Sequence, residues 1–188
     1  RAESAVLLYV VLRACALHRL FQHAAWLRPA LVGAVEEFGR GTRIDVSAIE
    51  SQIRDIDPSR PEAIQDAMSG GLFEPESTPE QLKALERLET MLALIEGWVD
   101  EVVAQATKDR MPAAAPLAEA MRRRRGAGGP AEQTFASLVG LELRPRKLRE
   151  AATLWAALRD RQGADKRDAP WSHPDLMPST ADLDDPPG

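Results

Sequence analysis

Cysteine, histidine and glutamate side chains with metal-binding chemistry lie close together in the first forty residues. Cys15 and His18 are three residues apart, His23 follows, and Glu36 and Glu37 are adjacent in the next segment. Thiolate, imidazole and carboxylate groups all bind zinc, so Cys15 and His18 could hold a metal together with either glutamate. The alternative is structural. Cys15 then fills a small core position, and both histidines hydrogen-bond to backbone or carboxylate groups.

Arg13 is the other residue of this stretch that needs a partner. A guanidinium group that is buried without a counter-ion is strongly destabilising. We therefore expect Arg13 to form an ion pair with Glu36 or Glu37 of the following segment. Arg13, His18, Glu36 and Glu37 are accordingly the residues that we expect in a binding site.

Residues 7–23, which carry most of these side chains, are expected to form the helix at the centre of the fold. The stretch contains no glycine or proline, and its apolar side chains cover nearly every side at helical spacing. A helix that is apolar all round is typically surrounded by other helices. The sequence thus predicts an all-α protein, a multi-helix bundle around a buried N-terminal helix.

Start and stop signals predict further helices. Pro29 is expected to open a second helix, which Gly39 and Gly41 stop. The segment Thr78-Pro79-Glu80-Gln81 is a strong helix start and opens the longest predicted helix, to about Lys108. The apolar residues of that helix recur at intervals of three and four residues. This spacing predicts a seam, a continuous apolar stripe that packs along another helix. The seam consists of Leu85, Leu88, Leu92, Ile95, Val99, Val102 and Ala106.

The remaining segments divide into shorter helices and a tail. Helices are predicted at about 47–54, 58–69, 116–125, 131–139 and 145–162, and no alternating strand pattern is present. Residues 1–162 are expected to form one helical domain. Residues 163–188 are expected to be a mostly irregular tail, with Trp171-Ser172-His173-Pro174 as its anchoring cluster.

Composition narrows the class of protein. The net charge of −5 argues against a general nucleic-acid binder, and one cysteine excludes a disulfide framework, so we expect a cytoplasmic protein. The apolar run is interrupted by Arg13 and is expected to be too short to span a membrane. The chain starts at Arg1, within a helical pattern and not at a methionine. We therefore expect that a segment of the same protein precedes it and is its partner.

Several separated segments, taken together, resemble a known family. The segments are Leu12-Arg13-Ala14-Cys15-Ala16-Leu17-His18-Arg19-Leu20-Phe21, Trp26-Leu27-Arg28-Pro29, Gly33-Ala34-Val35-Glu36-Glu37-Phe38, Gly97-Trp98-Val99-Asp100, Gly140-Leu141-Glu142-Leu143-Arg144-Pro145-Arg146 and Trp171-Ser172-His173-Pro174-Asp175-Leu176. They are similar, in the same order, to zincin-like bacterial proteins, mostly actinobacterial, known as zinc-dependent metalloproteases or hydrolases. The resemblance runs over nearly the whole chain.

The resemblance implies a zinc motif, and this chain departs from it. Zincins use H-E-x-x-H on a helix, where two histidines four residues apart bind zinc and the glutamate activates water. The matching frame here is Arg13-Ala14-Cys15-Ala16-Leu17. Arg13 and Leu17 stand at the histidine positions and Ala14 at the general base, so none of the chemistry of the motif is retained. Moving the H-E-x-x-H pattern so that its last histidine is His18 or His23 does not restore the motif either.

Three hypotheses follow. The first is a zincin-like protein that lacks the peptidase centre, needs no cofactor and acts by binding a peptide or protein partner. The second is a working zinc hydrolase with ligands drawn from His18, His23, Glu36, Glu37 or His173. The third is a structural helical module that assembles with itself or with the preceding segment.

Overall fold

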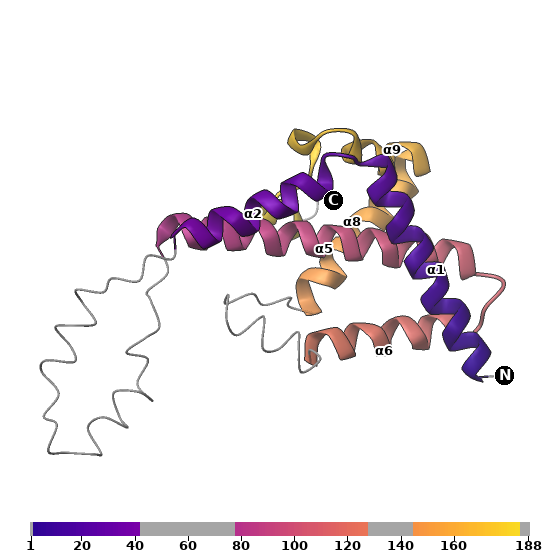
Figure 1. Cartoon of the computed structure of the whole chain (residues 1–188). Helices are drawn as coiled ribbons and strands as arrows, with labels where there is room; N and C mark the ends of the chain where they lie inside the picture. The colour runs from indigo at the N-terminus through magenta and orange to yellow at the C-terminus, as the bar shows by residue number, and fades with distance from the viewer. Residues whose placement is uncertain (1, 42–77, 128–144, 185–188) are drawn as a thin grey trace, which may run out of the picture.

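The computed structural model describes residues 2–41, 78–127 and 145–184, and every regular element in these ranges is a helix (Figure 1). The all-α prediction is therefore confirmed. The elements in chain order are α1 (Ala2–His23), α2 (Leu27–Gly41), α5 (Pro79–Thr107), α6 (Ala114–Ala127), α8 (Pro145–Gln162), α9 (Ala164–Asp168), η1 (Ala169–Ser172), η2 (Pro174–Leu176) and α10 (Thr180–Asp184). The helices predicted at about 47–54, 58–69 and 131–139 lie outside the described residues.

The long helix α5 is the element around which the other helices pack. It contacts α1, α2, α6 and α8, and Figure 1 shows α2 lying along it and α1 crossing it. Its start is the predicted one. Gln81 N donates to Thr78 Oγ1 at 3.2 Å, and Thr78 N donates to Gln81 Oε1 at 2.8 Å, a reciprocal capping box. Leu88, Ile95 and Val99 of the predicted seam are buried, whereas Ala106 is exposed.

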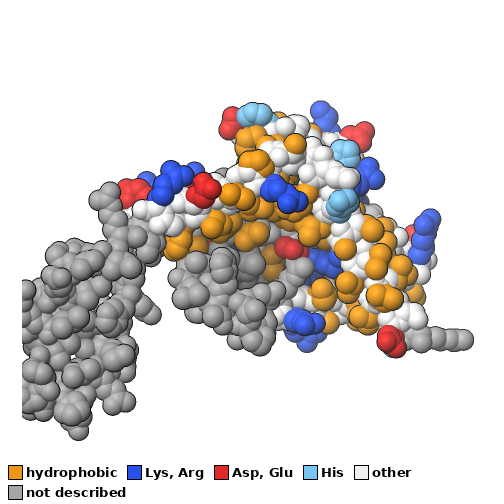
Figure 2. All heavy atoms as spheres, viewed as in Figure 1, with side chains coloured by type: hydrophobic (Ala, Val, Ile, Leu, Met, Phe, Trp, Pro, Cys, Tyr) orange, Lys and Arg blue, Asp and Glu red, His pale blue; other side chains and the backbone are white. Residues whose placement is uncertain are grey.

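The N-terminal helix is buried on one face only, so the prediction of a buried central α1 is wrong. Tyr9 and Leu20 are 2% exposed, whereas Leu7 and Val11 are 65% and 47% exposed. Figure 2 shows apolar side chains open to solvent over α1. The error has a simple cause: because apolar residues surround the whole helix, their spacing did not reveal which face would be covered.

The length of α1 also differs from expectation. The segment Glu3–His23 is long and apolar enough, by length and composition alone, to cross a membrane. The expectation that the apolar run is too short is therefore wrong. Composition does not decide the role of this helix, because core helices and signal sequences near an N-terminus meet the same criterion. One face of α1 packs on α5.

Helices α5 and α8 approach each other closely at Gly97. A Cβ atom added there would lie 2.6 Å from both Ala151 Cβ and Ala152 N, far inside ordinary contact distance. Beside this crossing the fully buried Trp155 donates its indole N–H to the Leu94 carbonyl oxygen at 2.9 Å. Only glycine therefore allows this helix pair to pack as it does.

The C-terminal segment forms short helical pieces that pack on the bundle (Figure 1). Trp171 is buried as the sequence indicates. Its ring stacks on Trp155 with centroids 5.3 Å apart, and meets Trp98 edge-on at 6.4 Å. Trp26 donates its indole N–H to the Trp171 carbonyl oxygen at 2.8 Å, which ties the start of α2 to the tail. These aromatic contacts anchor the tail to α2, α5 and α8.

Candidate functional site

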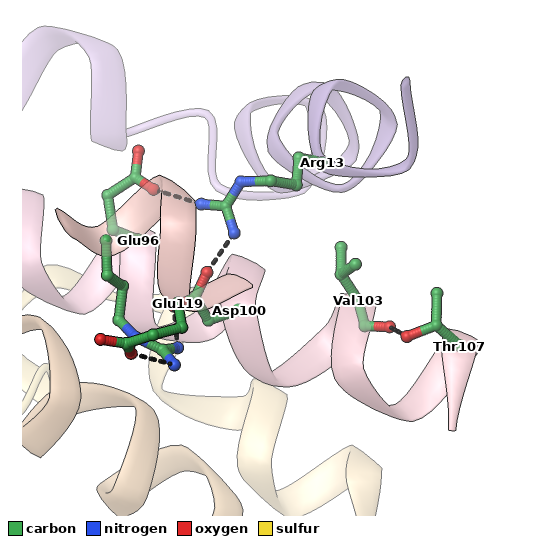
Figure 3. Close-up of polar contacts among 7 residues, drawn as sticks. Arg13, Glu96, Asp100, Val103, Thr107 and Glu119 are labelled. Carbon is green, nitrogen blue, oxygen red and sulfur yellow. Dashed lines mark hydrogen bonds and ion pairs between the residues drawn. The ribbon is translucent and has the colours of Figure 1, made fainter. Parts of the chain in front are cut away.

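The guanidinium group of Arg13 lies between two carboxylates of α5 (Figure 3). Arg13 Nη2 donates to Glu96 Oε2 at 2.6 Å, and Nη1 donates to Asp100 Oδ1. The three side chains are 7%, 19% and 9% exposed, so the pairs are largely shielded from water. Glu96 and Asp100 are four residues apart, which places both acids on the side of α5 that faces α1.

A second arginine, from α6, completes this cluster. Arg122 Nη1 donates to Asp100 Oδ2 at 3.1 Å, and Nη2 donates to Glu119 Oε2 at 3.1 Å. Burial opposes the charge on Arg122, but the hydrogen bonds to Glu119 and Asp100 outweigh it and raise the pKa of the guanidinium. The hydrogen bond from Arg122 lowers the pKa of Glu119. We call these five residues the Arg13 network; it links α1, α5 and α6.

The Arg13 network leaves almost no open space. The cavity among Arg13, Glu96, Asp100 and Arg122 has a volume of about 10 Å³. A volume of this size admits one water molecule at most. A peptide bond therefore has no room between α1 and α5 at this point.

The partner predicted for Arg13 is wrong, although a carboxylate pairing does occur. Glu37 forms an ion pair with Arg87 of α5, and Glu36 lies 3.9 Å from Arg40 on its own helix. Both glutamates are solvent-exposed. They therefore stabilise α2 and its contact with α5 instead of neutralising Arg13.

The predicted ligands of α1 lie on its exposed surface. Cys15, His18 and His23 are all exposed, so the expectation of a core position for Cys15 is wrong. Gln22 Nε2 lies 2.9 Å from His18 Nε2, one turn along the helix. His173 lies in the tail, where its Nδ1 accepts from Asp175 N at 3.3 Å. Within residues 2–41, 78–127 and 145–184, no three His, Cys, Asp or Glu side chains are placed to hold a metal ion.

A family model described as "zincin-like metallopeptidase" matches residues 1–188. The chain belongs to the zincin-like metallopeptidase family. No curated protein and no solved structure gives a significant match.

The three residues that the resemblance aligns with the zinc motif do not have the chemistry of zinc ligands. Arg13, aligned with the first histidine, is buried, and a guanidinium has no lone pair to donate to a metal. Ala14, aligned with the general base, is exposed, and Leu17, aligned with the second histidine, is partly buried. None of the three side chains can ligate a metal or accept a proton.

Sequence reasoning missed Glu96 and Asp100. A signal was present, because both acids flank Gly97-Trp98-Val99 in the part of α5 with the densest run of buried residues. Acids in such a position require a partner. The sequence does not show which of its many arginines supplies that partner.

Proposed function

We propose that this zincin-like protein does not hydrolyse peptides and instead acts by binding a peptide or protein partner on a helical scaffold. One observation carries the proposal: Arg13, which the resemblance aligns with the first zinc ligand of the motif, is bonded to Glu96 and Asp100. Activating water for attack on an amide needs a Lewis acid and a base within hydrogen-bond reach of the water. Arg13, Ala14 and Leu17 supply neither.

The ion pairs also explain how the scaffold can persist without a cofactor. Zincins take their third protein ligand from an element that follows the motif helix, and Glu96 and Asp100 face the motif position from α5. Glu96 and Asp100 lie close together and are little exposed, so their negative charges repel each other unless a positive charge lies between them. In this chain a guanidinium supplies the charge that a metal ion supplies in an active zincin.

Metal analysis and a substitution series test the proposal. The purified protein should carry no stoichiometric zinc and should not cleave an unfolded protein substrate in a metal-dependent way. The triple variant Arg13→His, Ala14→Glu, Leu17→His should gain zinc. Each single substitution should gain no peptidase activity, because ligands and base act as a unit. The matched control is the double variant Ala14→Glu, Leu17→His, which keeps Arg13 and should not bind zinc.

The opposite outcome is equally definite. Chelator-sensitive cleavage by the unmodified protein, abolished by His18→Ala, Glu36→Gln or Glu37→Gln, would show that the chain is an active hydrolase with other ligands. One equivalent of tightly held zinc that is lost with His18→Ala would contradict the proposal in the same way.

The exposed apolar face of α1 favours one second candidate, a helical module that assembles with itself. Its members are Val6, Leu7, Leu8, Val10 and Val11, and Figure 2 shows apolar side chains gathered over α1. Exposed apolar patches of this kind often mark interfaces. Solution mass measured against concentration tests this candidate. A mass that increases with concentration in the unmodified protein but not in Val11→Glu would support it.

A further inference from the structure

A large cleft lies on a different part of the molecule from the Arg13 network. It has a volume of about 990 Å³ and is formed by α2, α5 and residues 174–181 of the tail, which lie beside α2 in Figure 1. Trp26, Met91, Leu94 and Met177 contribute large apolar side chains to its lining. Clefts of several hundred cubic ångströms with an apolar lining and a few polar groups are the usual form of a ligand site.

Small residues of α2 give the cleft its width. Ala30, Gly33 and Ala34 occupy one face of the helix and line the cleft opposite Met91 and Leu94. A Cβ atom added at Gly33 would meet no atom within 4 Å, so this wall opens onto free space. The cleft can therefore receive a bulky side chain without rearrangement of α2.

Acidic side chains outnumber basic side chains in the lining of the cleft. Glu37 is paired with Arg87, and Arg40 lies 3.9 Å from Glu36 on the same helix. Two further acids line the cleft, Glu86 on α5 and Asp175 in the tail. Among the described residues no lysine or arginine lies within ion-pair distance of Glu86 or Asp175, and His173 lies 3.5 Å from Asp175.

We propose that this cleft binds a peptide segment in which leucine or methionine side chains are flanked by lysine or arginine. The apolar side chains would lie against Trp26, Met91 and Met177, which are partly exposed, and the flanking cations would lie near Glu86 and Asp175. The inference rests on the proposed binding function and gives that function a location and a ligand class. It does not depend on the Arg13 network, whose residues do not line the cleft.

A model peptide tests the ligand class. The probe is the labelled peptide acetyl-Lys-Leu-Leu-Met-Lys-amide, and its fluorescence anisotropy is followed as the full chain is added. We expect saturable binding that weakens with added salt, and no comparable binding of the peptide with glutamate in place of both lysines. Glu86→Gln should weaken binding of the lysine peptide roughly twofold to fivefold, as expected for the loss of one exposed charge contact.

Two glycines of α2 provide a matched pair of variants for locating the site. Gly33→Leu would place a side chain in the cleft, whereas Gly39→Leu adds the same side chain to the same helix outside the cleft lining. Neither Cβ meets an atom within 4 Å, and leucine favours a helix over glycine, so both variants should fold. Circular dichroism and thermal unfolding check this. Gly33→Leu should abolish peptide binding, and Gly39→Leu should leave it unchanged.

The remaining outcomes separate this inference from the proposed function. Absence of binding up to millimolar peptide, preference for the glutamate peptide, or full binding by Gly33→Leu would each overturn the assignment of the cleft. Mass spectrometry of the peptide after incubation reports on catalysis independently. If the unmodified chain cleaves the peptide in a metal-dependent way and Gly33→Leu abolishes this cleavage, the assignment of the cleft is supported. The proposed lack of peptidase activity is then wrong.

Discussion

Replacing Arg13 by glutamine should destabilise the protein more than any surface ion-pair substitution. The change removes the positive charge between Glu96 and Asp100 and leaves both acids largely shielded from water. Removing one partner of a buried ion pair typically costs about 3–5 kcal/mol. Because Asp100 keeps its bond from Arg122, the loss should lie near the lower end, about 3 kcal/mol. For a chain of this size that corresponds to a decrease in Tm of roughly 6–12 °C.

Urea unfolding followed by circular dichroism measures this loss. The slope of the unfolding free energy against urea should stay unchanged, so that the shift in midpoint reports stability alone. Arg87→Gln is the matched control, since it breaks an ion pair with Glu37 in which both side chains are well exposed. Exposed pairs contribute about 0–1 kcal/mol. A loss in Arg13→Gln no larger than that in Arg87→Gln would refute the role assigned to the Arg13 network.

Two further predictions concern packing and pH. Gly97→Ala should lower Tm, because the new methyl group would clash with Ala151 at a cost of about 1–3 kcal/mol, whereas Gly39→Ala should not. The bonds from the Ser179 hydroxyl and backbone N–H lower the pKa of the Asp182 carboxyl. The pKa of Asp182 is thus lower in the folded state than in the unfolded state, so the ionised carboxyl stabilises the fold at neutral pH. This stabilisation is lost as the pH falls through the folded-state pKa. The difference in unfolding free energy between Asp182→Asn and the unmodified protein should therefore be largest at neutral pH and should shrink in acid; a difference that grows in acid would contradict this.

The long helix α5 could be predicted from the sequence because its signals are local. Thr78 and Gln81 lie three residues apart, and the capping box that they form depends only on atoms within that turn. The helical spacing of apolar residues likewise continues along the whole element. The predicted span, to about Lys108, agrees with the observed end at Thr107.

The position of α1 could not be predicted in the same way. Its apolar residues face all directions, so burial depends on which surface α5 offers and not on any pattern within α1. The buried face contains Tyr9, Arg13, Ala16 and Leu20, three or four residues apart. That spacing is visible in the sequence, but Leu7 and Val11 belong to an equally regular face that stays exposed. Only the tertiary contact distinguishes the two faces.

The partner of Arg13 was missed for a related reason. The sequence shows that Arg13 needs an acid, and Glu36 and Glu37 are the nearest acids along the chain after the motif. Distance along the chain is a poor guide here, since Glu96 and Asp100 lie more than eighty residues away and reach Arg13 only because α1 crosses α5. Ion pairs between helices follow the crossing geometry, which local sequence patterns do not encode.

The charges of the Arg13 network bear on the proposal that ion pairs stand where a zincin would bind its metal. Glu96, Asp100 and Glu119 carry three negative charges, and Arg13 and Arg122 bring two positive charges from α1 and α6. The two arginines together carry the same charge as one zinc ion, and they also tie three helices together, although Arg122 divides its bonds between Asp100 and Glu119. Replacing Arg13 alone removes half of that charge, while Arg122 still holds Asp100. In the triple variant with the motif restored, Arg122 should thus compete with zinc for Asp100, and adding Arg122→Gln should tighten zinc binding; equal affinity with and without Arg122 would show that Asp100 takes no part in holding the metal.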